Sequence, residues 1–184
     1  YAPDEWQGLE RVFPDYKDPA LAECGLVIDN EQGRRYDRFR DRVMFPILDQ
    51  RGNVIGFGGR VIGAGEPKYL NSPETPLFEK GRELYGLLQA RSAIRDEDCV
   101  IVVEGYMDVV ALAQHGIGNA VATLGTATTP THVHKLLRQA DRVIFCFDGD
   151  NAGRKAAARA LDASLEHVAD NKTVAFLFLP TEDD

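Results

Sequence analysis

The stretch Val100-Ile101-Val102-Val103-Glu104-Gly105-Tyr106-Met107-Asp108 begins as an apolar, β-branched run and ends in acidic residues beside a glycine. A later stretch, Val143-Ile144-Phe145-Cys146-Phe147-Asp148-Gly149-Asp150, repeats this pattern. Each apolar run predicts a strand that is buried on both faces, and a segment of helical periodicity follows each one. Ligands bind at the carboxyl ends of parallel strands in open α/β sheets. We therefore expect Glu104, Asp148 and Asp150 to meet at one edge of one sheet.

These acidic residues suggest a metal site. Asp148 and Asp150 are two apart on an extended backbone, so their side chains point the same way. Clustered carboxylates raise one another's pKa unless a cation neutralises them, and hard oxygen ligands suit Mg²⁺ or Mn²⁺. The alternative interpretation is that Glu104 and the two aspartates only cap unrelated turns, because acidic residues often follow buried strands.

The pattern of elements predicts the fold class. From residue 99 onward, strands at 100–103, 120–124, 143–147 and 174–179 alternate with helical segments, and Thr129-Pro130 opens one of them as N-cap and first helical residue. This alternation predicts a parallel sheet with right-handed crossovers. Before it, we expect strands at 26–28, 43–48 and 53–57, a hairpin turn at 50–53, and a helix near 86–95. The proline-rich stretch 67–76 is expected to contain no regular structure and to act as a functional loop.

Charge is distributed unevenly along the 184 residues, although the formal net charge is -8. Residues 1–32 hold two basic and eight acidic side chains, whereas residues 33–82 hold ten basic and six acidic ones. A basic middle beside an acidic site is typical of a metal-dependent phosphoryl enzyme, because one surface holds the polyanion and the other the cation. Within it, residues 33–42 interleave arginines with two aromatic residues, which fits either a solvated segment with ion pairs or a phosphate-binding surface.

Several site classes are excluded by composition. No apolar run approaches the roughly 20 residues that span a bilayer, and no signal peptide is visible at the start. The three cysteines are widely spaced, and His132 and His134 lie on different faces of a predicted helix, so neither set suggests zinc. A start without methionine suggests a piece of a longer chain.

The motifs together resemble a known family. Glu104-Gly105 after a strand and Asp148-Gly149-Asp150 after a later strand look like the Toprim signature of topoisomerases, primases and some nucleases. The flanking motifs resemble the RNA polymerase domain of bacterial DnaG-type primases: Arg38-Phe39-Arg40-Asp41-Arg42-Val43-Met44-Phe45-Pro46-Ile47, Gly56-Phe57-Gly58-Gly59-Arg60 and Pro67-Lys68-Tyr69-Leu70-Asn71-Ser72-Pro73-Glu74-Thr75. This resemblance implies a Toprim-type parallel sheet flanked by helices over residues 99–184, preceded by a smaller basic α+β subdomain over residues 1–98.

The resemblance also implies a set of site residues. Glu104, Asp148 and Asp150 would be catalytic, and two or more Mg²⁺ or Mn²⁺ ions would be held by Glu104, Asp108, Asp148, Asp150 and Asp184. No zinc is expected in this chain, because the family's zinc-binding domain has no counterpart here. Nucleic acid or nucleotide would be bound by Arg38, Arg60, Lys68, Tyr69, Asn71 and Lys80.

The implied activity is template-directed synthesis of short RNA primers for replication. The 3′-hydroxyl of one nucleotide would attack the α-phosphate of the next. The implied partners are a single-stranded DNA template, ribonucleoside triphosphates, the RNA primer and, through a domain absent here, the replicative helicase, in the bacterial cytoplasm and away from any membrane. The alternatives are a Toprim nuclease or topoisomerase and a non-catalytic Toprim module that binds DNA. An aspartyl-phosphate phosphatase is disfavoured by Asn151-Ala152-Gly153 after the aspartates.

Overall fold

The computed structural model describes residues 1–180, which form two compact units. The first unit comprises residues 1–48 and 53–79, and the second comprises residues 49–52 and the chain from residue 80 onward. Among residues 1–180, no helix combines the length and apolarity needed to cross a bilayer.

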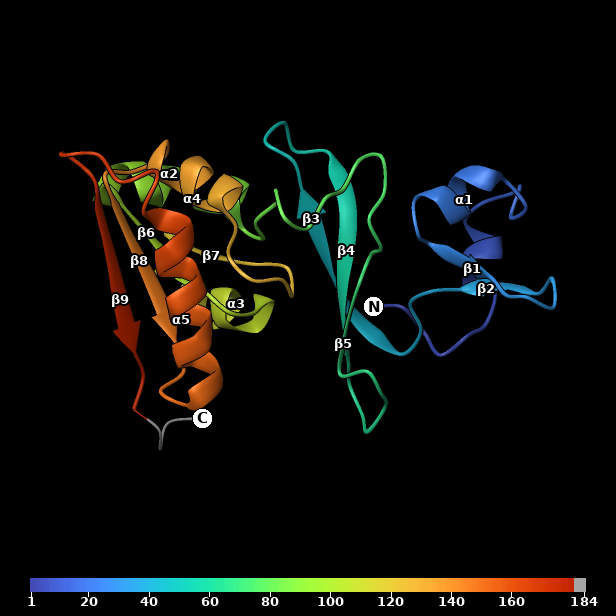
Figure 1. Cartoon of the computed structure of the whole chain (residues 1–184). Helices are drawn as coiled ribbons and strands as arrows, with labels where there is room; N and C mark the ends of the chain where they lie inside the picture. Colours follow the sequence, from blue (N-terminus) through green and yellow to red (C-terminus); the bar gives the residue numbers. More distant parts are fainter. Residues whose placement is uncertain (181–184) are drawn as a thin grey trace. The chain divides into compact units, whose positions relative to one another are not determined.

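The first unit is built from short elements (Figure 1). It contains two short helices, a two-stranded antiparallel ladder and a three-stranded antiparallel sheet of order β3-β4-β5. The elements are η1 (Gly8–Arg11), α1 (Pro19–Glu23), β1 (Val27–Asp29), β2 (Arg35–Asp37), β3 (Arg42–Leu48), β4 (Val54–Val61) and β5 (Tyr69–Asn71). The strands predicted at 26–28, 43–48 and 53–57 are thus confirmed as β1, β3 and β4.

The prediction that residues 67–76 contain no regular structure is wrong for β5. Tyr69–Asn71 pairs antiparallel with β4, with Arg60 opposite Tyr69. Proline lacks the N–H that a strand ladder requires. Pro67 and Pro73 only flank this segment, however, so its own N–H groups remain available.

A buried polar pair links the elements of the first unit. Tyr16, Leu21 and Val27 form its small apolar cluster, and the Tyr16 hydroxyl donates a hydrogen bond of 2.7 Å to Asp37 Oδ1. The other carboxylate oxygen of Asp37 accepts the Leu9 N–H at 2.9 Å. Asp37 is only 4% exposed, so these two donors replace the water that its carboxylate would otherwise bind.

Tyr16→Phe is expected to lower the free energy of unfolding by about 1 kcal/mol at neutral pH, because a buried acceptor loses its donor. Burial, followed by the hydrogen bond to Asp37, raises the pKa of the Tyr16 phenol above its ordinary value. Since an unfolded tyrosine ionises near pH ~10, the contribution of this bond is complete below that pH and is lost progressively as the pH rises toward the folded-state pKa. Urea unfolding at about pH 8 and pH 11 would therefore show a smaller alkaline loss for Tyr16→Phe than for the wild type. Tyr36→Phe is the control. If the free energy of unfolding of Tyr16→Phe fell as much between the two pH values as that of the wild type and of the control, this assignment would be contradicted.

The second unit is a four-stranded parallel sheet of order β7-β6-β8-β9 with helices between its strands (Figure 1). Its elements are α2 (Leu87–Glu97), β6 (Cys99–Val103), α3 (Tyr106–Gln114), β7 (Ala120–Ala122), α4 (Pro130–Leu137), β8 (Arg142–Phe147), α5 (Asn151–Ser164) and β9 (Thr173–Phe178). Thr129 caps α4 by accepting the His132 N–H at 3.1 Å, and Pro130 occupies the first turn. The predicted alternation of strands and helices is confirmed.

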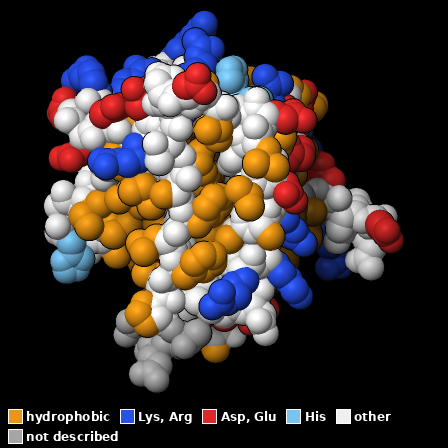
Figure 2. All heavy atoms as spheres, turned by 60° about the vertical axis from the view of Figure 1, so that its left-hand side comes forward, with side chains coloured by type: hydrophobic (Ala, Val, Ile, Leu, Met, Phe, Trp, Pro, Cys, Tyr) orange, Lys and Arg blue, Asp and Glu red, His pale blue; other side chains and the backbone are white. Residues whose placement is uncertain are grey.

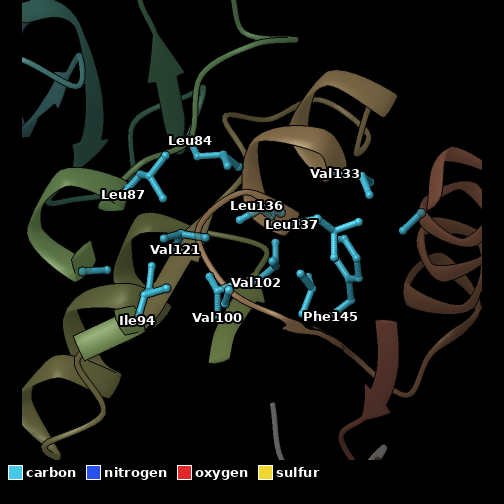
Figure 3. Packing of buried hydrophobic residues seen from close by; sticks show 14 of the residues in the cluster. Leu84, Leu87, Ile94, Val100, Val102, Val121, Val133, Leu136, Leu137 and Phe145 are labelled. Atoms are coloured by element: carbon cyan, nitrogen blue, oxygen red, sulfur yellow. The ribbon is translucent and has the colours of Figure 1, made fainter. Parts of the chain in front are cut away.

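The main core lies on the sheet face that α2, α4 and α5 cover (Figure 3). It joins Ile94 of α2, Val133 and Leu136 of α4, and Val100 and Phe145 of the strands, all at most 1% exposed. On the other face, α3 packs against β6 and β7 in a smaller cluster that includes Val103, Val109 and Ala122. Alternate residues of β6 therefore enter opposite cores, as strand geometry requires.

Hydrophobic side chains remain exposed at the β9 side of this unit, which comes forward in Figure 2. The larger ones on α5, β9 and the residues after them are Leu161, Leu165, Val168, Leu177, Phe178 and Leu179. All three cysteines are free thiols, and Cys24 is exposed.

The segment 80–98 packs with the second unit, because Leu84, Leu87 and Ile94 belong to the main core. The compact units therefore divide the chain near residue 80. The predicted subdomain boundary at 98/99 stays a prediction.

Candidate active site

Glu104 and Asp148 follow two neighbouring strands at the same edge of the parallel sheet. β6 and β8 pair in parallel, with Cys99 opposite Arg142 and Val102 opposite Phe145. The Asp148 N–H donates a hydrogen bond of 3.4 Å to Glu104 Oε1. The chain ends of β6 and β8 are therefore linked directly, as the sequence predicts.

Three aspartates act on Glu104 at this edge of the sheet. The pKa of Glu104 is raised above its ordinary value, first by burial and then by the negative charges of Asp148, Asp150 and Asp108, while the Asp148 N–H opposes the shift. The pKa of the neighbouring Cys146 thiol is raised in the same way, by burial and by Asp148, Asp108 and Glu104. Glu104, Asp108, Asp148 and Asp150 thus form one negative cluster, which we call the carboxylate cluster.

Two members of the carboxylate cluster also cap helices. Asp108 Oδ2 accepts the Gly105 N–H at 2.9 Å at the start of α3, and Asp150 Oδ1 accepts the Gly153 N–H at 2.7 Å at the start of α5. A carboxylate has two oxygens with about four lone-pair sites, so one capping bond uses only part of its acceptor capacity. The capping interpretation and the metal interpretation are therefore compatible, and the caps fix how these carboxylates are oriented.

The donor set of the carboxylate cluster fits a hard divalent cation. All four groups offer oxygen, which Mg²⁺ and Mn²⁺ prefer, and a bound cation would relieve the repulsion that raises the pKa of Glu104. Within residues 1–180, no three acidic, histidine or cysteine side chains converge closely enough to hold a metal ion as they stand. Asp184, the fifth predicted ligand, lies outside the described residues. The predicted ligand set therefore stays a prediction.

Gly153 allows α5 to start close against the end of β8. A Cβ atom at this position would lie 2.1 Å from the Asp148 carbonyl oxygen and 3.1 Å from the Asp148 nitrogen. Both are backbone atoms, so a side chain could be accommodated only if the backbone of the carboxylate cluster moved.

Gly153→Ala is accordingly expected to lower both stability and any activity of the carboxylate cluster, although alanine favours helices more than glycine does. We expect a loss of at least about 1–3 kcal/mol in the free energy of unfolding, which is the usual cost of forcing extra atoms into a packed site. Urea unfolding measures it. Gly63→Ala is the control, because a Cβ atom at Gly63 meets nothing within 4 Å. Equal stability of the two variants would contradict the argument.

Predicted nucleic-acid-binding residues gather on β4 and β5 of the first unit. Arg60 and Tyr69 lie opposite each other in the ladder, and the Arg60 guanidinium lies 5.9 Å from the centre of the Tyr69 ring. Lys68 Nζ lies 6.0 Å from the same ring. Arg38 donates through Nε and Nη2 to the Asn71 carbonyl oxygen, at 3.3 and 3.1 Å. The structure thus brings together five of the six predicted residues, and we call them the basic surface.

Arg60 carries a polar atom that lacks a partner in the described part of the chain. Its Nε is buried and makes no hydrogen bond there. Leaving a guanidinium nitrogen unsatisfied is costly unless a ligand or water binds it.

Arginines between residues 33 and 42 serve both structure and surface. Arg35 forms a two-bond ion pair with Asp29, with both N···O distances 2.8 Å. Part of the segment therefore matches the interpretation as a solvated segment with ion pairs. Arg40 instead lies over the Trp6 ring, at 4.3 Å, and over the Tyr36 ring, at 5.1 Å. Trp6 is 63% exposed. The alternation of arginine and aromatic residues signals this cluster, but only the fold brings Trp6 into it.

Lys80, the sixth predicted residue, belongs to the second unit. Its carbonyl oxygen lies 3.0 Å from His132 Nε2. Arg154, which no sequence pattern marks as a site residue, lies one helical turn after Asp150. Its guanidinium lies 5.5 Å from the centre of the Phe178 ring.

Comparisons with known proteins identify the family. Residues 1–91 match the N-terminal domain of the DNA primase catalytic core, and residues 98–175 match the Toprim domain. The DNA primase of Neisseria meningitidis serogroup B is 62% identical over 184 residues, which cover 100% of this chain and 31% of that protein. The chain belongs to the DnaG-type DNA primases.

Solved DnaG-type structures share its fold. The Escherichia coli primase catalytic core has a TM-score of 0.94 and 53% identity, covering 100% of this chain and 59% of that one. A DnaG primase catalytic domain bound to single-stranded DNA has a TM-score of 0.94 and 52% identity, covering 100% and 60%. The chain thus spans less than a third of the Neisseria DnaG-type primase and about three fifths of these solved domains. The expected Toprim fold with a preceding α+β part is confirmed.

Proposed function

We propose that this chain carries the catalytic centre of an RNA-primer polymerase that joins ribonucleotides on single-stranded DNA. The observation that supports this most is the carboxylate cluster at the carboxyl ends of β6 and β8, where the Asp148 N–H donates a hydrogen bond of 3.4 Å to Glu104 Oε1. Its position is where ligands bind in α/β sheets, and the chain is a DnaG-type primase.

The reaction in this proposal is attack of a 3′-hydroxyl on the α-phosphate of a nucleoside triphosphate, which forms a phosphodiester bond and releases pyrophosphate. Glu104, Asp108, Asp148 and Asp150 would hold two or more Mg²⁺ or Mn²⁺ ions, which supply charge stabilisation of the attacking and leaving oxygens. The chain's own contribution is to fix these carboxylates by the two helix caps and by the Asp148 N–H on Glu104. Glu104 either binds a cation or accepts the proton of the hydroxyl.

The basic surface would hold the polyanion. Arg60 and Lys68 suit phosphate groups, and the Tyr69 ring offers a face on which a base can stack. Arg38 and the Asn71 carbonyl fix the strand that carries Tyr69. In the second unit, Lys80 would contact the nucleic acid or nucleotide.

The partners that follow from this proposal are single-stranded DNA, ribonucleoside triphosphates and the RNA primer, at the replication fork in the cytoplasm. Contact with the replicative helicase would be made by a part of the protein outside this chain.

The test is incorporation of labelled ribonucleotides on single-stranded DNA with Mg²⁺ or Mn²⁺, both for this chain and for a polypeptide of its relatives' length that contains it. Short, metal-dependent RNA products from the longer polypeptide support the proposal. Products from the chain itself would show that it suffices for the chemistry. DNA nicking or relaxation without RNA synthesis would instead indicate a Toprim nuclease or topoisomerase. DNA binding without metal-dependent nucleotide binding would indicate a non-catalytic module.

Lys68→Ala is expected to weaken binding of single-stranded DNA to a similar extent for all sequences, because a lysine–phosphate contact carries no base readout. The slope of log affinity against log salt concentration should become shallower by about 1, since one phosphate fewer is neutralised. Fluorescence anisotropy of labelled oligonucleotides over a salt series measures this. Arg91→Ala, an exposed cation on α2, should leave the slope unchanged. An unchanged slope for Lys68→Ala would exclude a phosphate contact by Lys68.

A further inference from the structure

Helix α4 holds four consecutive backbone carbonyls of the irregular segment that carries Lys80. His132 Nε2 lies 3.0 Å from the Lys80 carbonyl oxygen and 3.1 Å from that of Glu83. The Thr129 hydroxyl donates to the Gly81 carbonyl oxygen at 2.7 Å, and Lys135 Nζ donates to that of Arg82. The three side chains Thr129, His132 and Lys135 are called the α4 clamp below. Residues 80–84 belong to no helix or strand, so the hydrogen bonds of the clamp replace those that regular secondary structure would supply.

The hydrogen bonds of His132 define one tautomer. The Thr129 N–H donates to His132 Nδ1 at 3.2 Å, so Nδ1 carries no proton. Nε2 is then the protonated nitrogen, and it donates to the two carbonyl oxygens, which can only accept. His132 is fully buried, and burial lowers its pKa below the ordinary histidine value. The neutral imidazole is thus a fixed donor that aims at the backbone of Lys80 and Glu83.

The helix that carries the clamp packs into the main core of the second unit. Val133 and Leu136, on the same helix, are fully buried in the main core. Lys135 also pairs with Glu83 Oε2 at 3.0 Å, so its ammonium is anchored on a side chain of the segment as well as on its backbone. Any shift of α4 would therefore also move the backbone of Lys80 and Arg82.

We propose that the α4 clamp, through His132 above all, positions the Lys80 segment for contact with single-stranded nucleic acid. This inference rests on the proposed role of Lys80. A lysine on an irregular segment loses more conformational entropy on binding a phosphate than one on a fixed backbone, so pre-organisation strengthens the contact. His132 is a positioning residue: it touches the segment's carbonyls and acts through Lys80.

The experiment is a double-mutant cycle between His132→Phe and Lys80→Ala, in the chain and in the longer polypeptide. Binding of a fluorescein-labelled single-stranded DNA oligonucleotide is followed by anisotropy over a salt series. Lys80→Ala is expected to weaken binding roughly threefold to tenfold at low salt, as loss of one phosphate contact does. His132→Phe should weaken it to the same extent, and the double variant should be no weaker than either single one.

Three further variants separate positioning from misfolding. His132→Gln keeps an amide N–H donor at the position of Nε2 and is expected to restore binding. Lys135→Met removes the donor to Arg82 while leaving His132 in place, so it tests the clamp should His132→Phe fail to fold. His134→Phe, on the exposed face of α4, is the matched control and should bind like the wild type.

The outcomes distinguish the clamp from the proposed function. If Lys80→Ala binds the oligonucleotide normally, the proposed contact of Lys80 with single-stranded nucleic acid is wrong, and the inference falls with it. Suppose that Lys80→Ala weakens binding. If His132→Phe then leaves binding unchanged, or if its effect adds in full to that of Lys80→Ala in the double variant, only the positioning role is overturned. Loss of binding by both variants without additivity, together with rescue by His132→Gln, supports the clamp.

Discussion

Asp148→Asn is expected to lower ribonucleotide incorporation by roughly two to three orders of magnitude, the scale of a positioned electrostatic group in an active site. Asp148 follows β8 directly, its own N–H donates to Glu104, and its negative charge acts on that residue. Asparagine keeps the size and the backbone N–H but removes the negative charge. The charge that would hold the cations is therefore lost while the hydrogen bond to Glu104 remains possible.

The measurement is incorporation of labelled ribonucleotides on single-stranded DNA in the longer polypeptide, combined with urea unfolding of the chain. Stability should change little, because removing one of four repelling carboxylates relieves rather than breaks the local structure. Asp170→Asn, an exposed aspartate beyond α5, is the matched control and should retain incorporation. Incorporation by Asp148→Asn within a few-fold of the control would exclude Asp148 from the catalytic centre.

The carboxylate cluster was predictable because its determinants are local. The apolar runs that become β6 and β8 are short and β-branched or aromatic, and a parallel sheet brings the carboxyl ends of such strands to one edge. That rule alone places Glu104 beside Asp148, which the hydrogen bond between them confirms. The sequence left open whether Glu104, Asp148 and Asp150 only cap turns or bind a metal. The structure shows that Asp150 caps α5, and that its negative charge also acts on Glu104.

Other features depend on contacts between distant residues and carry no local signal. His132 lies within hydrogen-bonding distance of carbonyls about fifty positions earlier in the chain. The sequence around His132 does not indicate these bonds. Asp37 meets Tyr16 in the same way, through the fold. β5 was missed because proline signals dominated the segment, whereas pairing with β4 involves only three of the residues between Pro67 and Pro73. The compact second unit extends back to residue 80 because Leu84 enters its core, a partnership that periodicity cannot reveal.

Phe145→Ala is expected to lower the free energy of unfolding by about 3–5 kcal/mol, the usual cost of removing a buried phenylalanine. Phe145 is fully buried at the middle of β8, and its ring stacks on Phe147 at 6.1 Å and on Phe176 at 5.6 Å between centroids. The substitution removes ring contacts on both sides and leaves a cavity in the main core, which α4 and α5 help to form (Figure 3). Because a domain is stable by only about 5–15 kcal/mol, this is a large part of the total.

Urea unfolding followed by circular dichroism measures this loss, with Leu177→Ala on the neighbouring strand β9 as the control. Leu177 is 51% exposed, so its truncation removes little buried surface and should cost about 1 kcal/mol or less. The effect of the substitution at Phe145 should also reach the carboxylate cluster, because Asp148 directly follows the end of β8. In urea well below the wild-type midpoint, Phe145→Ala should therefore lose incorporation together with structure, whereas Asp148→Asn loses incorporation alone. Similar unfolding midpoints for Phe145→Ala and Leu177→Ala would contradict the central place of β8 in the core.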